Sequence, residues 1–306
     1  MVMKKRILTE AAGSPVSAYM IKSIQQAGHV AVASDISEDC AAKAFADDFV
    51  IFPKKNDPIL WQKIEQCLID HKIDVVIPSF DEMLSGWAER KELFEAKGIK
   101  ILVSPLDTIQ IFQDKWKTAE FFENNDLPCA ESSLEPIYPL VKPRFGRGSV
   151  GVFIEHNKQE RIKKFTDEDI SQTVLQGEEY TVDCLFGATS KPIYIVPRKR
   201  VGVVNGKSTG GEVVYSSIIE KEIKRLAKCT KFVGPINVQC FVNDEALHFV
   251  EVNPRIAGGM ALGFAATTNW VPHFVDILED KAINDLGSEV KWGLKMFRTY
   301  QEFYIQ

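Results

Sequence analysis

The sequence predicts an α/β first subdomain built on a parallel, doubly wound sheet, followed by an α+β part with antiparallel sheets. Three observations lead to this expectation. The chain has 306 residues, a length that suits two or three packed subdomains. Strand and helix patterns alternate through its first third, as in parallel sheets with crossover helices. From Leu140 onward, short β-branched runs follow one another with brief turns, which is typical of antiparallel sheets.

Short apolar segments in the first third are expected to form the parallel sheet. The strands are expected at residues 7–8, 30–33, 49–52, 75–78 and 101–103, and the helices at 16–27, 60–71 and 85–97. Gly98 is expected to end the last of these helices, because glycine commonly follows a helix C-terminus. Ligands of such sheets bind at the carboxyl ends of the strands. The segments 9–14 and 79–82 lie at two such ends.

Ser104-Pro105 marks a boundary after which the pattern changes. A helix is expected at residues 114–124, with Asp114 as its cap. The strands are expected at residues 140–142, 151–154, 179–186, 193–200, 213–215, 236–242 and 247–253, and further helices at 157–165, 219–232 and 269–279. The glycine-rich segment 202–211 is expected to be a mobile loop.

Charge and composition exclude several classes of protein. The formal net charge is −5 and the isoelectric point about 5.7, so there is no strong positive field for nucleic acid or anionic lipid. The six cysteines form no Cys-x-x-Cys pair, which fits reduced thiols in a cytoplasm. The histidines lack zinc spacing, and neither a secretory signal nor a run of ~18 apolar residues is present. We therefore expect a cytoplasmic protein that binds neither nucleic acid nor membrane.

The segment 247–259 carries the most informative pattern. A strand places alternate side chains on one face, so Glu251, Asn253 and Arg255 should share a face while Val250 and Val252 point into packing. Burying these polar groups without ligands would cost several kcal/mol. A Mg²⁺ ion with phosphate oxygens would satisfy all three, since Mg²⁺ prefers hard oxygen ligands. The alternative is an exposed edge strand with an ordinary salt bridge.

The strand just upstream offers a further oxygen ligand. Asn237 and Gln239 should share one of its faces, with Val238 and Cys240 opposite. Antiparallel pairing across the turn at 243–245 would bring Gln239 beside Glu251. Taken alone, Gln239 is more often a surface residue, so its ligand role depends on that pairing.

A lysine and a glycine-rich loop point to phosphate binding. Lys142 lies in an apolar strand, where a lysine is costly unless it meets an anion. Gly146, Gly148 and Gly151 follow, but a second strand succeeds them rather than the helix of a dinucleotide site. They are therefore expected to form a flexible hairpin loop, whose backbone amides and Ser149 could fold over phosphates. The alternative is a surface lysine beside a plain hairpin turn.

The region around residue 177 gives a weaker signal for a nucleotide base and sugar. Val174 and Leu175 are apolar and could frame an adenine. Glu179 or Glu178 could accept hydrogen bonds from ribose hydroxyls. A solvated turn would explain the same residues.

Four further cations have open assignments. Lys115 starts a helix, where lysines are common. Arg198 and Arg200 share a strand face ahead of a loop that contains Lys207. Because arginine pairs with carboxylates in a bidentate way, these three residues could form a site for a substrate carboxylate. A plain basic strand face is equally compatible with the sequence.

These segments, in this order, resemble the ATP-grasp superfamily, and within it the carbamoyl-phosphate-synthase-like ligases. The resemblance is strongest at Asn237-Val238-Gln239 followed by Glu251-Val252-Asn253-Pro254-Arg255. It implies a Rossmann-like subdomain at residues 1–105, a small lobe at 106–177, and a large lobe at 178–306 that carries the metal and phosphate site. ATP would lie between the lobes.

The resemblance also implies residue roles. Lys115 and Lys142 would contact the phosphates and the adenine region, and Glu179 would hold the ribose. Gln239, Glu251 and Asn253 would hold Mg²⁺, for which Mn²⁺ could substitute, and Arg255 would steady the transferring phosphoryl group.

The function implied is that of a stand-alone ligase that joins a small, amino-acid-like carboxylate to an amine. Its substrates would be small molecules, the carboxylate would react as an acyl phosphate, ADP and phosphate would be released, and a homodimer would be compatible with the pattern. An ATP-binding sensor or subunit without turnover is the alternative. A dehydrogenase with a dinucleotide on the first sheet is a further rival, but the segment 9–15 carries only Gly13 and not a full glycine fingerprint.

Overall fold

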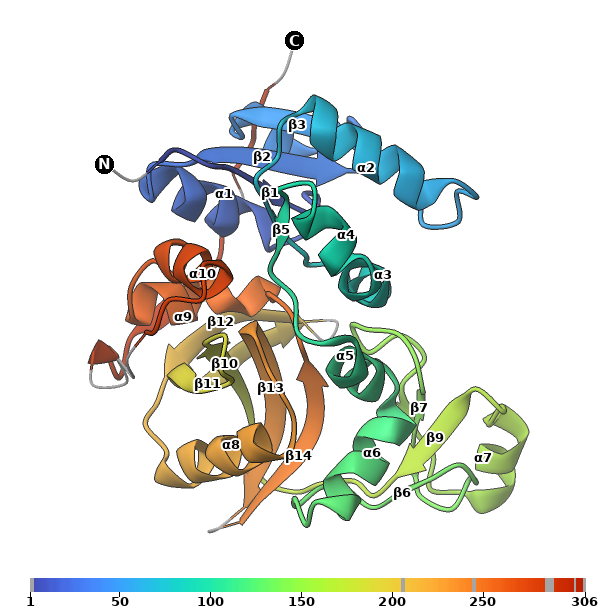
Figure 1. Cartoon of the computed structure of the whole chain (residues 1–306). Coiled ribbons are helices and arrows are strands. Elements are labelled where there is room, and N and C mark those ends of the chain that lie inside the picture. Colours follow the sequence, from blue (N-terminus) through green and yellow to red (C-terminus); the bar gives the residue numbers. More distant parts are fainter. Residues whose placement is uncertain (1–2, 205–206, 244–245, 284–288, 300, 305–306) are drawn as a thin grey trace.

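The computed structural model describes residues 3–204, 207–243, 246–283, 289–299 and 301–304. Figure 1 shows three bodies around three sheets: a blue-to-cyan subdomain, a green lobe and a yellow-to-red lobe. The first sheet is parallel and the other two are antiparallel, so the predicted fold class is confirmed.

The first sheet has the strand order β3-β2-β1-β4-β5. Its strands are β1 (Arg6–Thr9), β2 (Val30–Asp35), β3 (Asp48–Ile51), β4 (Val75–Ile77) and β5 (Lys100–Ile101). The helices between them are α1 (Ser17–Gln26), α2 (Leu60–Asp70), α3 (Leu84–Glu89) and α4 (Lys91–Glu95), with 3-10 turns at Ala41–Ala44 and Asp81–Met83. The single helix expected at residues 85–97 is therefore wrong, because the chain breaks at Arg90 into two short helices. The strand order reverses beside β1, so the ends of β1 and β4 open onto the same edge.

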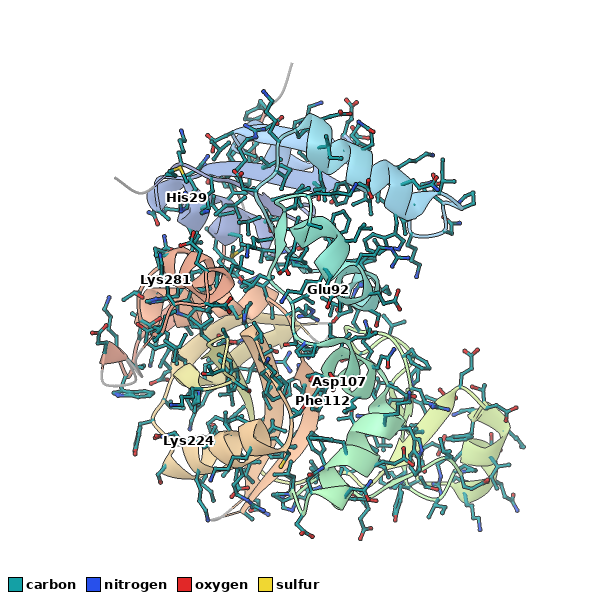
Figure 2. All side chains as sticks on the ribbon, in the orientation of Figure 1. His29, Glu92, Asp107, Phe112, Lys224 and Lys281 are labelled. Atoms are coloured by element: carbon teal, nitrogen blue, oxygen red, sulfur yellow. The ribbon has the colours of Figure 1, made fainter. Side chains whose placement is uncertain are left out.

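Two helices connect the first sheet to the small lobe. α5 (Leu106–Gln113) was not expected, and Asp114 then caps α6 (Lys115–Asn124) through the backbone amide of Trp116. Phe112, labelled in Figure 2, fixes α5 against the large lobe, with ring centroids 5.3 Å from Phe121 and 5.5 Å from Phe232. This aromatic contact ties the helix pair to the large sheet.

The small lobe is a sheet with the order β6-β9-β7-β8 and one covering helix. Its elements are β6 (Ser132–Ser133), β7 (Leu140–Pro143), β8 (Phe153–Ile154), β9 (Asp169–Gln172) and α7 (Lys158–Lys164). The sequence did not indicate β9, which is short and carries Asp169 and Gln172. It pairs along the full length of β7, with Lys142 opposite Ile170.

The large sheet is antiparallel in the order β14-β13-β10-β11-β12-β15. Its strands are β10 (Glu178–Phe186), β11 (Pro192–Val204), β12 (Lys207–Val213), β13 (Gly234–Asn243), β14 (Ala246–Asn253) and β15 (Lys295–Phe297). The helices are α8 (Ser217–Cys229), α9 (Ala261–Ala266) and α10 (Val271–Leu278), with a 3-10 turn at Gly258–Met260. The loop expected at residues 202–211 is wrong, since Val203 pairs with Ser208 and Val204 with Lys207. β-branched valines favour extended pairing there despite the neighbouring glycines.

The C-terminal segment crosses back over the molecule. β15 pairs with β12, placing Phe297 opposite Gly210. The chain then runs toward the first subdomain, as Figure 1 shows, where the ring of Phe303 lies 5.0 Å from that of Phe45. None of the helices described here is long and apolar enough to cross a membrane.

Candidate functional site

A cavity of about 670 Å³ lies between the small and large lobes and reaches the first subdomain. The residues that the sequence singled out are brought together in it. Those that line it are Lys115, Lys142, Gly146, Gly148, Ser149, Val174, Leu175, Glu179, Arg198, Arg200, Gln239, Glu251, Asn253 and Arg255. The backbone of Lys207 starts β12, but its side chain lies outside the described part of the structure.

Oxygen ligands gather on one face of the β13–β14 pair. Gln239 lies directly opposite Glu251, and Asn237 opposite Asn253, as the predicted pairing requires. A bulge after Gln239 shifts the register, so that Val250 has no partner of its own. The expectation that Val250 points into packing is therefore wrong: it lines the cavity, whereas Val252 is buried in the core.

This oxygen cluster suits a hard cation that shares its ligands with phosphates. Within the described ranges, no group of three or more His, Cys, Asp or Glu side chains is placed to hold a metal ion. The cluster instead offers the carboxylate of Glu251 with the amide oxygens of Gln239 and Asn253. Mg²⁺ is usually held by one or two carboxylates together with substrate phosphates and water. The donor set therefore fits Mg²⁺ when a polyphosphate is present.

Arg255 is held by a carboxylate from the first subdomain. Its Nε donates to Asp81 Oδ1 at 2.7 Å and its Nη2 to Asp81 Oδ2 at 2.8 Å, a bidentate pair. Nη2 also donates to Asn253 Oδ1 at 3.1 Å. The guanidinium is thus fixed beside the oxygen cluster. The sequence marked the segment 79–82 as a strand end but assigned no role to Asp81.

Lys142 is a buried cation without a close anion. Its side chain projects from β7 into the cavity and only 5% of the residue is exposed. Burial lowers the pKa of its ammonium group to about 8, and the charge of Lys115 acts in the same direction while Glu251 opposes it. Of the carboxylates that the structure describes, none lies within ion-pair distance of it. The site therefore presents a charge that an incoming anion would neutralise.

The glycine-rich loop folds from β7 toward the first subdomain. Gly146, Gly148 and Ser149 all have positive φ angles, which hold the loop in a tight, irregular path. Lys115 Nζ donates to the carbonyl of Gly146 at 2.9 Å. Arg147 lies over the ring of Phe80, 4.4 Å from its centroid, and pairs with Glu82. The loop therefore contacts the segment that also carries Asp81.

The two arginines of β11 are already paired inside the protein. Arg198 is buried, and its Nε donates to Asp183 Oδ2 at 2.8 Å, while Arg200 pairs with Glu179. Asn237 Nδ2 supports Asp183 with a further bond of 2.8 Å.

A cation that the sequence did not single out lines the same cavity. Arg298 follows β15 and donates to the carbonyl of Gly258. It has no carboxylate partner among the described residues. It lies more than forty residues after Arg255, so no local pattern indicated it.

Gly259 leaves space for the buried arginine. A methyl group at this position would lie well inside contact distance of the Arg198 guanidinium, which cannot move without losing Asp183. We expect Gly259→Ala to lower the free energy of unfolding by about 1–3 kcal/mol, the usual cost of overpacking. A melting curve would measure this. Gly187→Ala is the control, because its nearest neighbour, 3.7 Å away, leaves room for the methyl group. Equal melting temperatures for the two variants would contradict the prediction.

Two family models match successive parts of the chain. Residues 112–259 match the model of the ATP-grasp domain, and residues 7–102 match that of the PylC-like N-terminal domain. Over 222 residues, 63% of the chain, it is 26% identical to the arginine-specific large chain of carbamoyl phosphate synthase from Halalkalibacterium halodurans. The match covers 21% of that protein, so the chain spans about a fifth of its length.

Solved structures share the fold at low sequence identity. A biotin carboxylase–ATP complex from Campylobacter jejuni superposes with a TM-score of 0.76 at 13% identity, covering 96% of this chain and 75% of that one. An L-amino acid ligase from Bacillus licheniformis gives 0.72 at 17% identity, covering 90% and 74%. The chain therefore carries an ATP-grasp domain at residues 112–259 after a PylC-like N-terminal domain at residues 7–102, and it shares the fold of these enzymes.

Proposed function

We propose that the protein is an ATP- and Mg²⁺-dependent ligase that joins a small, amino-acid-like carboxylate to an amine through an acyl phosphate. One observation carries the proposal. A single cavity combines a buried lysine without an anion, an oxygen cluster suited to Mg²⁺, and Arg255 fixed beside that cluster. The names of two similar proteins, a carbamoyl phosphate synthase and an L-amino acid ligase, support the same class of reaction.

The nucleotide would lie between the lobes. Its adenine would rest against Val174 and Leu175, and its ribose hydroxyls would donate to the carboxylate of Glu179. The triphosphate would meet Lys115 and Lys142 together with the backbone amides of the glycine-rich loop and Ser149.

Mg²⁺ would be held by Glu251, Gln239 and Asn253, where it would offset the phosphate charge. Arg255 would orient the γ-phosphoryl group, and closure of the glycine-rich loop would exclude water from the reactive product.

The chemistry follows from what these residues can and cannot do. They stabilise charge on a transferring phosphoryl group, but the described residues that line the cavity include no cysteine, and no histidine to activate a hydroxyl, that could carry an acyl group. An oxygen of the substrate carboxylate would therefore attack the γ-phosphorus as the bond to ADP breaks. The amine would then attack the acyl carbon, and inorganic phosphate would leave. Arg198, Arg200, Lys207 and Arg298 are the candidates for holding the substrate. Arg198 and Arg200 each pair with a carboxylate, whereas Arg298 has no carboxylate partner among the described residues.

Trapping the intermediate tests this reaction. A coupled ADP-release screen over small acids and amino acids, alone and in pairs, would first identify the substrates. With the correct acid and ATP but no amine, hydroxylamine should give a hydroxamate while ADP accumulates. With ¹⁸O in the acid carboxylate, one label should appear in phosphate once the amine is added.

Two outcomes would contradict this mechanism. Release of AMP and pyrophosphate would mean adenylation, and retention of all label in the acid and amide would exclude an acyl phosphate. ATP binding without ADP release for any pair would indicate a sensor or subunit instead.

A further inference from the structure

The first subdomain reaches the site through Pro15, which lines the cavity, and through one short segment that contacts Arg255. Residues 79–82 follow β4 and present Asp81 to Arg255. We infer that Glu10 is a positioning residue which fixes this segment, so that the first subdomain sets the orientation of Arg255. The inference rests on the proposed role of Arg255 at the γ-phosphoryl group. Glu10 itself does not line the cavity.

Glu10 lies at the end of β1 and only 3% of it is exposed. Its Oε2 accepts the backbone amides of Ser79 at 3.0 Å and Phe80 at 3.2 Å. Its Oε1 accepts the indole Nε1 of Trp87 at 2.8 Å. Ser79 Oγ in turn donates a hydrogen bond of 2.6 Å to the backbone carbonyl of Glu10. All three groups that face the carboxyl are donors, an arrangement that only a carboxylate satisfies completely.

The segment is fixed from its other side as well. Gln113 of α5 donates to the carbonyl of Asp81, and its own Oε1 accepts Ser85 Oγ at 2.7 Å. Asp81 then has its two oxygens aligned on Nε and Nη2 of Arg255. The path from Glu10 to Arg255 therefore consists of short, directional bonds through a segment with little freedom.

Orientation is what this arrangement supplies. An arginine side chain has several rotatable bonds, and its fork acts on a phosphoryl group only in the correct plane. A displacement of about 1 Å in a positioned group can cost about a hundredfold in rate. Loss of the Glu10 carboxylate would leave three buried donors unsatisfied and release the segment that carries Asp81.

The same carboxyl responds to pH. Burial raises the pKa of Glu10 to about 7, and the charge of Asp81 also raises it, while the bonds from Trp87, Ser79 and Phe80 lower it. Asp81 is the charged group that acts on Glu10 from the packed segment, and α3 contributes only the neutral indole. As the pH falls through about 7, Glu10 would take up a proton. Its carboxyl could then no longer accept all of the hydrogen bonds that Trp87, Ser79 and Phe80 donate to it.

Nucleotide titrations test the inference without an identified substrate. The affinity of the intact chain for magnesium β,γ-imido-ATP, divided by its affinity for MgADP, gives a ratio that reports contacts to the γ-phosphate. We expect Glu10→Gln and Asp81→Asn each to lower this ratio about tenfold, a change of 1.4 kcal/mol, with MgADP affinity unchanged. Glu222→Gln is the matched control, since Glu222 is a buried carboxylate paired with Arg225 on α8, away from the cavity.

Three comparisons decide the outcome. The Glu10→Gln, Asp81→Asn double variant should match Asp81→Asn alone, because the two residues act in series. The ratio should fall below pH 7 in the wild type and stay flat in Glu10→Gln. If Arg255→Met lowers the ratio but Asp81→Asn does not, the positioning role is wrong. If Arg255→Met has no effect, the proposed role of Arg255 is wrong instead. If Glu10→Gln does not fold, Asp81→Asn still tests whether the segment 79–82 orients Arg255.

Discussion

Replacing Glu251 by glutamine is expected to lower turnover at least roughly a hundredfold, the scale of losing one charge-stabilising group. The substitution keeps the shape of the side chain but removes the only formal charge in the cluster with Gln239 and Asn253. Mg²⁺ would then be held weakly, because all three ligands at positions 239, 251 and 253 would be neutral amides. The negative charge that favours the ammonium form of Lys142 would disappear as well. ADP release measured over a range of Mg²⁺ concentrations would show the loss.

The fold of this variant should remain intact, because Glu251 lies at the cavity and not in the core. A melting curve in the absence of nucleotide checks this. Glu212→Gln is a matched control, as Glu212 is a carboxylate of the same sheet that pairs with Lys295 and does not line the cavity. Near-normal turnover of Glu251→Gln at saturating Mg²⁺ would remove Glu251 from the site.

The parts of the site that lie close together in sequence were predictable. Gln239 and Glu251 lie on strands that follow one another in the chain, so alternation along two strands and antiparallel pairing were enough to place them side by side. Lys142 and the glycine-rich loop are one continuous segment, and a lysine within an apolar strand itself indicates an anion-binding site. Local patterns also predicted the strand–helix alternation of the first sheet.

The remaining parts depend on tertiary contacts that no local pattern reveals. Asp81 and Arg255 are 174 residues apart, and their pairing requires the first sheet to dock on the large lobe. Arg298 reaches the cavity only because β15 pairs with β12. The bulge that turns Val250 toward the cavity is an irregularity of one residue in an otherwise regular ladder. In β11 and β12, the strand propensity of the valines outweighed the local preference of glycine for loops.

Replacing Lys142 by methionine is expected to weaken the binding or use of ATP about tenfold to a hundredfold, since charge-assisted bonds to phosphate contribute about 1.5–3 kcal/mol. The same change should not lower the melting temperature without nucleotide. A buried ammonium without a close anion is costly, whereas methionine has a similar length and is apolar. Lower function with equal or higher stability distinguishes a binding lysine from a structural one. Lys158→Met, on the exposed surface of α7, is the control.

The pH dependence of ATP affinity and of fold stability tests the role of Lys142 independently. The pKa of Lys142 is about 8, so its charge is present below that pH and is lost as the pH rises. ATP binding favours the charged form, so wild-type affinity for ATP should fall as pH rises through about 8 and binding should take up a proton there. Burial of the ammonium also lowers the stability of the fold. This loss of stability is fully present below about pH 8 and disappears as the pH rises toward 10.5, the ordinary pKa of a lysine. The methionine variant should show neither trend. If ATP raises the melting temperature of variant and wild type equally, with the same pH profile and turnover, Lys142 serves the fold and not the phosphates.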